Sequence, residues 1–402
     1  MLWFFRSMYV LIFYTGIIIY TGLRLFAFCR LFRPSLKKRF FWPFYLFFPY
    51  SFIIFALLRL DRIGVIRSAI MYLPIFFLYL FSFIFLFDII SLLQFLWKQK
   101  KQQKKEAVNR PVLSIEIGIA LILTLLILVY STFHAQVIKT AHYSLNFTGR
   151  EFSPDNQGTL KIVLVSDLHI GPTVGKKWVS AIVDRINDAE PDMVCMAGDI
   201  FDSGADGMAD PEGIAFELRR INAPLGVYAC PGNHDANRRT RSLDEIYNFL
   251  SKAGIILLAD ESVITPYSPN KPDIVVTGRR DARPIGMSGD RLAIQTLHTK
   301  DADNEIPVNI KPFLILLDHQ PIELSKTAEA GFDLVLCGHT HKGQVFPGNI
   351  FTNFIYKKAG GTHYGHWQKE NTQAIITSGA GVWGPPLRFG TNSEIAVIEV
   401  RY

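Results

Sequence analysis

Aspartate, asparagine and histidine residues form five clusters in the second half of the chain, and each cluster directly follows a short apolar run. The runs at residues 160–165, 193–197, 227–230, 313–317 and 334–337 have the length and composition of buried β-strands. The clusters that follow them are Asp167-Leu168-His169, Gly198-Asp199-Ile200-Phe201-Asp202, Gly232-Asn233-His234-Asp235, Asp318-His319 and Gly338-His339-Thr340-His341.

These side chains have the chemistry of a binuclear metal site. Ligands of open α/β sheets bind beyond the carboxyl ends of the strands, so the five clusters are expected to meet in one polar pocket. Carboxylate, imidazole and amide oxygen together suit Mn, Fe, Zn or Co. None of the four cysteines belongs to the set, which argues against a structural zinc site. Two such ions about 3.5–4 Å apart share a bridging carboxylate and clamp a phosphate.

The order of these motifs resembles the calcineurin-like metallophosphoesterase superfamily. The apolar N-terminal half, together with the run at residues 378–388, is similar to transmembrane metallophosphoesterases of the bacterial YkuE-like group. The resemblance implies an α/β fold, a four-layer α-β-β-α sandwich, preceded by an all-α transmembrane region of about four helices. The composition changes between about Tyr130 and Ala141, which divides the chain into a membrane region, residues 1–135, and a phosphoesterase, residues 136–402.

The resemblance assigns metal-binding roles residue by residue. The first metal is expected to be bound by Asp167, His169 and His341. Asp199 is expected to bridge both metals, and Asn233, His319 and His339 are expected to be the other ligands of the second metal. Two divalent ions are therefore the expected cofactors, with Mn, Fe, Zn and Co all compatible.

Further residues are expected around the metals. The resemblance places His234 beside the phosphate, where it stabilises the transition state or protonates the leaving oxygen. Asp202 and Asp235 are expected to orient histidines. Arg388 and His366 are candidates for substrate contact, but an ion pair inside the protein explains Arg388 equally well, and an exposed loop position explains His366.

The expected reaction is hydrolysis of a phosphate ester or anhydride. Two metals lower the pKa of a shared water, and the resulting hydroxide attacks phosphorus in line with the leaving group. Metals and His234 offset the charge that develops on the phosphoryl oxygens. No covalent intermediate is needed, so no serine or cysteine nucleophile is expected.

The first part of the chain has the composition of a membrane region. A membrane-spanning helix needs about twenty mostly apolar residues. Four segments meet this requirement, near residues 8–28, 40–58, 69–97 and 112–131. The first lacks a small-residue cleavage site and is followed by further spans, so it is interpreted as a retained helix and not as a signal peptide.

The net charge of +7 is concentrated between these segments. This distribution concerns membrane topology and not nucleic acid, and no nucleic-acid motif is present. The first connection carries Arg30, Arg33, Lys37, Lys38 and Arg39, and the third carries Lys98, Lys100, Lys101, Lys104, Lys105 and Arg110. Basic connections stay in the cytoplasm, so the phosphoesterase half is expected to face outward from a bacterial cytoplasmic membrane.

Two carboxylates fall within the apolar segments. Asp88 lies in the third segment and Glu116 near the start of the fourth. An ionisable residue at membrane depth is a functional candidate, whereas a position near the interface gives either residue an ordinary surface role. The sequence leaves their roles open.

The substrate is also open. A domain tethered so near to the last span favours a membrane-surface or envelope phosphoester, including a lipid-linked one, with membrane lipids as the other contact. A UDP-2,3-diacylglucosamine pyrophosphatase of lipid A synthesis is one alternative, but its substrate is cytoplasmic. A phosphomonoesterase of proteins or nucleotides is a second alternative. A non-catalytic membrane binding module is the third, and loss of a metal ligand would have favoured it.

Overall fold

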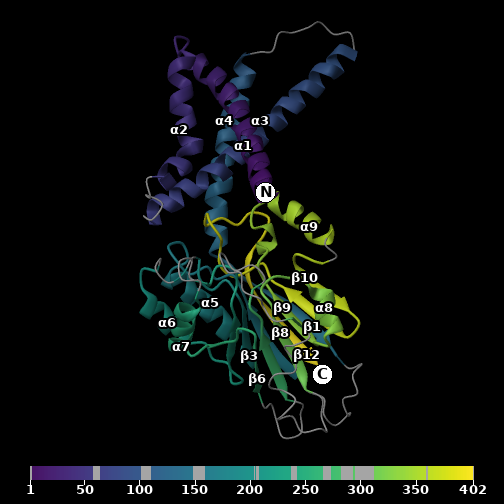
Figure 1. Ribbon diagram of the computed structural model, residues 1–402. Coiled ribbons are helices and arrows are strands. Elements are labelled where there is room, and N and C mark those ends of the chain that lie inside the picture. The colour runs from purple at the N-terminus through teal and green to yellow at the C-terminus, as the bar shows by residue number, and fades with distance from the viewer. Residues whose placement is uncertain are drawn as a thin grey trace. The chain divides into compact units, whose positions relative to one another are not determined.

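The computed structural model describes residues 2–57, 64–100, 110–147, 159–202, 204, 208–236, 242–265, 273–281, 293–294, 312–358 and 361–401. The chain divides into two compact units, Met1–Ser131 and Thr132–Tyr402. The first contains helices α1 (Leu2–Phe32), α2 (Lys38–Leu57), α3 (Gly64–Lys100) and most of α4 (Arg110–Ala135). Figure 1 shows these four long helices.

The helices of the first unit expose large apolar side chains, as lipid-facing helices do. Phe44 on α2, Leu93 on α3 and Leu126 on α4 are all exposed. Three described segments are long and apolar enough to cross a membrane: Tyr9–Phe32, Ile70–Lys100 and Ile115–Ala135. They correspond to three of the four expected spans. The second expected span is helix α2, which is not among the three, and part of its side chains lie outside the described residues.

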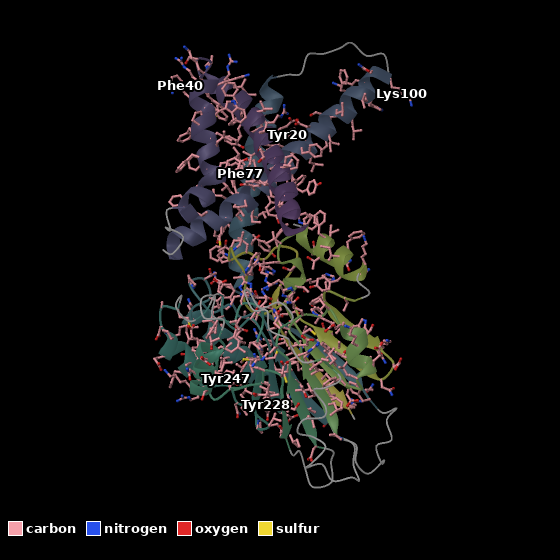
Figure 2. The ribbon with its side chains drawn as sticks, viewed as in Figure 1. Tyr20, Phe40, Phe77, Lys100, Tyr228 and Tyr247 are labelled. Carbon is pink, nitrogen blue, oxygen red and sulfur yellow. The ribbon has the colours of Figure 1, made fainter. Side chains whose placement is uncertain are left out.

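Aromatic side chains pack the first unit together. Tyr45 of α2 stacks on Phe41 and meets Phe77 of α3 edge-on, with ring centroids 5.4 and 5.8 Å apart. Gly22 of α1 makes this approach possible, because a Cβ there would lie 2.6 Å from the Tyr45 ring. Tyr20 and Phe77 lie inside this bundle (Figure 2).

The carboxylate of Asp88 has partners within the first unit. It pairs with the guanidinium of Arg24 and accepts a hydrogen bond from the hydroxyl of Tyr20. The carboxylate of Glu116 accepts from Ser91 at 3.2 Å. Both contacts join neighbouring helices, which gives these two acids a role in holding the bundle together. Of the two expected basic connections, the first, with Arg30 and Arg39 at its ends, lies within the described residues, whereas residues 101–109 of the third lie outside them.

Two six-stranded sheets form the centre of the second unit. The first has the order β1 (Ile138–Asn146), β12 (Ser393–Arg401), β2 (Thr159–Val165), β3 (Met193–Ala197), β4 (Val227–Cys230) and β5 (Ile256–Leu257). The second has the order β10 (Gly365–Lys369), β11 (Thr372–Ile376), β9 (Leu334–Cys337), β8 (Phe313–Leu317), β7 (Ile274–Gly278) and β6 (Glu261–Thr265).

Buried apolar side chains fill the space on both sides of each sheet. Ile162 and Cys195 of the first sheet pack against Ile315 and Leu336 of the second. The other face of the first sheet packs against α5 (Lys176–Asp188), α6 (Pro211–Arg219) and α7 (Asp244–Lys252). The other face of the second sheet packs against α8 (Leu324–Glu329). This arrangement confirms the expected α-β-β-α sandwich.

The five strands expected to carry the polar clusters are β2, β3, β4, β8 and β9, and within each sheet they run parallel. The sequence interpretation did not predict β1, β10 or helix α9 (Gly348–Lys358). Strand β1 pairs with the C-terminal strand β12 across more than 250 intervening residues, which local pattern does not reveal.

Helix α4 leads into the second unit at one defined edge of the first sheet. Its last turn ends at Ala135, and β1 begins at Ile138 beside Ser393 of β12. Strand β12 runs antiparallel to β2, with Ala396 opposite Leu164. The start of β12 therefore lies at the edge where β2 ends. The hydroxyl of Ser393 donates to the carbonyl of Ala135 at 2.7 Å and fixes this entry point.

Candidate metal centre

Strained backbone positions the polar clusters at the ends of the strands. Asp167, His169, Asp199, His339 and His341 all have positive φ, between 48° and 72°. Residues other than glycine rarely adopt this left-handed conformation, and each instance costs roughly 1–3 kcal/mol. The turns redirect the chain as it leaves β2, β3 and β9, and the side chains of these residues converge beyond the strand ends.

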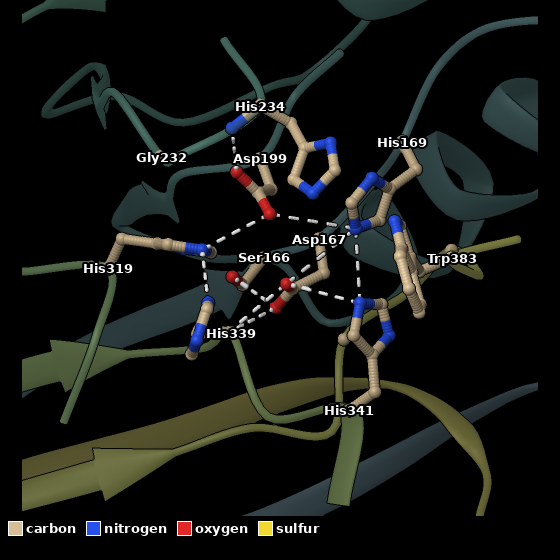
Figure 3. A network of polar contacts seen from close by, with 12 residues as sticks. Ser166, Asp167, His169, Asp199, Gly232, His234, His319, His339, His341 and Trp383 are labelled. Atoms are coloured by element: carbon tan, nitrogen blue, oxygen red, sulfur yellow. Dashed lines mark hydrogen bonds and ion pairs between the residues drawn. The ribbon is translucent and has the colours of Figure 1, made fainter. Parts of the chain in front are cut away.

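The first group of candidate ligands contains Asp167, His169 and His341. The two histidine Nε2 atoms lie 3.0 Å apart, and Asp167 Oδ1 lies 3.4 Å from Nε2 of His341. The other carboxylate oxygen of Asp167 is tied to the protein. It accepts from Ser166 Oγ at 2.7 Å and from the backbone N–H of His339 at 2.9 Å. Figure 3 shows these contacts converging.

The second group contains Asp199, His319 and His339. Nε2 of His319 lies 3.2 Å from Oδ2 of Asp199 and 3.2 Å from Nδ1 of His339. Since the carbonyl of Ala197 only accepts, Nδ1 of His319 donates to it at 2.7 Å, and Nε2 is left to face Asp199 and His339.

Asp199 also reaches the first group. Its Oδ2 lies 3.7 Å from Nε2 of His169, while its Oδ1 accepts from the backbone N–H of His234 at 2.8 Å. One carboxylate therefore lies between both groups of candidate ligands, as a bridging ligand must.

Burial and mutual charge determine the protonation of these groups. Burial lowers the pKa of His169 to about 4 and that of His339 to about 3, which leaves both imidazoles neutral near pH 7. Burial also lowers the pKa of His341. Neutral imidazole is the form that binds a metal. Burial raises the pKa of Asp167 to about 6, although nearby His319 opposes the shift.

Asp199 and His319 form an oppositely charged pair within this cluster. Burial alone would raise the pKa of Asp199, but the adjacent His319 outweighs it and lowers that pKa. Burial would lower the pKa of His319, whereas the carboxylate of Asp199 raises it well above the usual value. The pair thus keeps a negative charge on the carboxylate that lies between the two groups. A metal bound through Nε2 of His319 would displace the proton that this pairing favours.

The donor atoms fit divalent metals. Two nitrogens that share an ion at about 2.1 Å lie roughly 3.0–3.4 Å from each other, and both histidine pairs have this spacing. Among the described residues, the buried Oδ1 of Asn233 has no hydrogen-bond partner. A buried acceptor without a partner is costly unless it binds an ion or water. Asn233 lines the same pocket as His169 and His339.

His234 is placed to act on a substrate. Its Nδ1 donates to the backbone carbonyl of Asp202 at 2.8 Å, so its Nε2 is left for the pocket that it lines. Asp202 therefore orients His234, through its backbone carbonyl. Asp235 braces two loops instead of a histidine, since it accepts from the backbone N–H groups of Phe201 and Gly232 at 2.8 and 2.7 Å. Burial raises the pKa of Asp235 to about 8.

The two expected substrate contacts lie elsewhere. Arg388 is fully buried, and its guanidinium donates to the carbonyls of His341, Ser378 and Gly381 at 2.7–3.0 Å. It supports the loop of His341 and does not face the pocket, which corrects the expected contact with substrate. His366 pairs with Gln373 on β10–β11 and is not among the residues that line the pocket.

Other pocket residues had no assigned role in the sequence interpretation. Trp383 lines the pocket, and its ring lies edge-on to that of His234 with centroids 6.3 Å apart. Gln344 holds Trp383 by two hydrogen bonds, from Nε2 to the Trp383 carbonyl at 2.8 Å and from the Trp383 N–H to Oε1 at 2.9 Å. A tryptophan within a Gly-Pro-rich run was the signal available in the sequence.

Comparison with known proteins agrees with this geometry. A model of the family "Calcineurin-like phosphoesterase" matches residues 160–343, which contain all of the candidate ligands. An uncharacterized metallophosphoesterase of Aquifex aeolicus is 30% identical over 60% of this chain and 85% of its own length. The chain belongs to the calcineurin-like metallophosphoesterases. The predicted family is thereby confirmed.

Two relatives bear on the subgroup of this metallophosphoesterase. The YkuE protein of Bacillus subtilis is 29% identical over 60% of this chain and 79% of its own length. A zebrafish "Transmembrane protein with metallophosphoesterase domain" is 30% identical over 70% of this chain and 62% of its own. The chain spans about 60% of the length of several other bacterial relatives that it matches.

Gly338 lies close to Asp167 of the first group of candidate ligands, and this contact yields a prediction. A Cβ at Gly338 would lie 1.8 Å from Ser166 Oγ and 2.3 Å from Asp167 Oδ2. We expect Gly338→Ala to displace Asp167, to lower the free energy of unfolding by about 1–3 kcal/mol and to reduce bound metal. Metal analysis and thermal unfolding of the purified protein measure both effects. Gly175→Ala is the matched control, because a Cβ there has no atom within 4 Å; equal metal content in G338A and G175A would contradict the prediction.

A second prediction distinguishes His339, which follows β9, from His366, which lies on β10. We expect His339→Ala to weaken metal binding by at least about 100-fold, because one imidazole of the second group is lost. His366→Ala should bind metal as the natural protein does, since His366 contacts Gln373 instead. Titration with Mn²⁺ and Zn²⁺, followed by metal analysis, distinguishes the variants. Equal affinities of H339A and H366A would show that His339 is not a ligand.

Proposed function

We propose that this protein is a membrane-anchored two-metal phosphoesterase that hydrolyses a phosphate ester or anhydride carried at the membrane surface. The observation that carries the proposal is the carboxylate of Asp199, which lies between two complete groups of candidate ligands. Seven residues would bind the metals: Asp167, His169, Asp199, Asn233, His319, His339 and His341. Bound metals supply a hydroxide near neutral pH and neutralise charge on the phosphate.

The protein's own groups around the phosphate support this reaction. His234 presents Nε2 to the pocket, where it donates a proton to the leaving oxygen or a hydrogen bond to the phosphoryl group. The backbone N–H of His234 and the ring of His319 orient Asp199 from opposite sides. Trp383 lines the pocket beside His234, where its ring can contact a bound substrate.

A membrane-surface substrate is supported by where the chain enters the second unit. The apolar segment Ile115–Ala135 ends two residues before β1 begins, and β1 begins at the edge where β2 ends in Asp167. The candidate metal centre and the point at which the chain leaves an apolar helix therefore share one edge of the first sheet. The name of the zebrafish relative, a transmembrane protein, agrees with this placement.

Hydrolysis of a small soluble phosphodiester tests the proposed activity. We expect the full-length protein with Mn²⁺ to hydrolyse bis-nitrophenyl phosphate, and chelation of metal to abolish the activity. His234→Ala should lower kcat by about 10²–10⁴-fold without loss of metal, because only the proton donor is removed. His142→Ala, an exposed histidine on β1, is the matched control. Absence of hydrolysis with every divalent metal, in protein shown to hold metal, would refute a catalytic role.

The orientation of the catalytic unit is tested separately. The basic connections of the sequence lead us to propose that the phosphoesterase unit faces outward from a bacterial cytoplasmic membrane. Reporter fusions after Arg110 and after Arg150 should give cytoplasmic and external signals, respectively. A cytoplasmic signal after Arg150 would reverse the orientation and would favour a cytoplasmic substrate, such as the UDP-linked diacylglucosamine of lipid A synthesis.

A further inference from the structure

Helix α9 exposes an apolar face to its surroundings. The side chains of Ile350, Phe351, Phe354 and Ile355 are 55%, 64%, 68% and 62% exposed. Their spacing places them along one side of the helix, which we call the α9 face. The polar side chains of Asn349 and Thr352 are the less exposed ones. A helix on a water-soluble domain has the opposite arrangement.

The α9 face lies next to the candidate metal centre. The 3₁₀ helix η5 (His341–Gly343) carries a candidate metal ligand, and a Cβ on Gly343 would lie 2.3 Å from the backbone nitrogen of Asn349. The first turn of α9 therefore rests on the wall of the pocket. The adjacent residue of that wall, Gln344, holds Trp383, whose side chain is 55% exposed at the pocket.

The charge of α9 indicates what covers this face. The helix contains no acidic residue, and it ends in the exposed pair Lys357 and Lys358. A helix that exposes apolar and aromatic side chains and ends in lysines suits the surface of an anionic bilayer. The rings enter the boundary of the acyl chains, and the ammonium groups contact lipid phosphates. Another surface of the same protein would bury the apolar side chains equally well but would gain nothing from the two lysines.

The entry point of the chain adds an independent argument. An apolar helix long enough to cross a membrane ends at Ala135, at the sheet edge that also carries Asp167. Helix α9 packs on η5, which follows β9 at the corresponding end of the second sheet. Both features lie at the same end of the second unit.

We propose that the α9 face lies in the surface of an anionic bilayer and presents the metal centre to phosphoesters carried by lipids of that bilayer. The contact with lipid stands on the exposure and charge of α9, whereas the lipid-borne substrate class rests on the proposed function. The α9 face then selects substrates by location, because an ester held in the membrane reaches the pocket. Trp383 lies beside the pocket, next to the bilayer surface.

Depth measurements test the contact with lipid. We would place a polarity-sensitive fluorophore on Phe354→Cys in full-length protein with Cys29→Ser, since the other three cysteines are buried. The protein would be reconstituted in phosphatidylcholine–phosphatidylglycerol vesicles that contain spin-labelled lipids. Phe216→Cys on α6 is the matched control, because Phe216 is an aromatic residue of similar exposure, 62%.

We expect the lipid spin labels to quench the fluorophore at position 354 and to have little effect at position 216. Emission at 354 should also shift to shorter wavelength when phosphatidylglycerol is present. Absence of lipid quenching at position 354 overturns the proposal, whether the α9 face is then covered by the protein's own helices, by a second copy or by water.

Hydrolysis of two esters tests the substrate class. The double variant Phe351→Ser/Phe354→Ser should hydrolyse a vesicle-bound nitrophenyl phosphodiester with a hexadecyl chain roughly tenfold or more slowly than the natural protein. Its rate on soluble bis-nitrophenyl phosphate should be unchanged. Equal rates of the variant and the natural protein on the vesicle-bound ester overturn the inference alone. Failure of the natural protein on both esters refutes the proposed function instead, and the quenching result still decides the lipid contact.

Discussion

The buried carboxylate of Asp199 is the interaction on which the candidate metal centre depends. It lies 3.2 Å from His319, 3.7 Å from His169 and accepts from the backbone of His234. A charged carboxylate is stable in such a buried place only when partners surround it. These partners come from the ends of β2, β4 and β8, so both sheets must end at a common edge for the carboxylate to be accommodated.

In the sandwich the strands of both sheets end at this common side, and the turns that follow the strands are strained. Five candidate ligands adopt positive φ, and the cost of these conformations must be offset by the cores on either side of the two sheets. Close backbone contacts remove the remaining freedom: at Gly338 a side chain would overlap Ser166 and Asp167. Rigid strand ends with strained turns hold ligands in place before a metal binds, which lowers the entropic cost of binding. Stability and metal affinity are therefore coupled in this fold.

The same edge of the second unit carries the features that relate it to a membrane. The end of an apolar helix is bonded to the start of β12 through Ser393, and α9 rests on the turn that contains His341. Arg388, fully buried, ties that turn to the carbonyls of residues 378–381. The turn that carries His341 is thus held between α9 and Arg388.

The sequence by itself determined the strands of the sheets and the identity of the clustered polar residues, and the resemblance carried by their order implied the family and the layered fold. It did so because short apolar runs followed by Asp, Asn and His are local patterns, and local patterns specify strand ends. Three of the four expected spans were also readable, because bilayer thickness sets a length that composition reveals. Only the tertiary structure decided the rest. Arg388 looked equally suited to substrate or to the interior, and its burial against the carbonyls of His341, Ser378 and Gly381 settled its place. Strand β1 was not predicted, because its pairing with β12 joins segments far apart in the chain. The outward-facing apolar side of α9 was not predicted either, because its exposure depends on which face of the helix neighbouring segments cover.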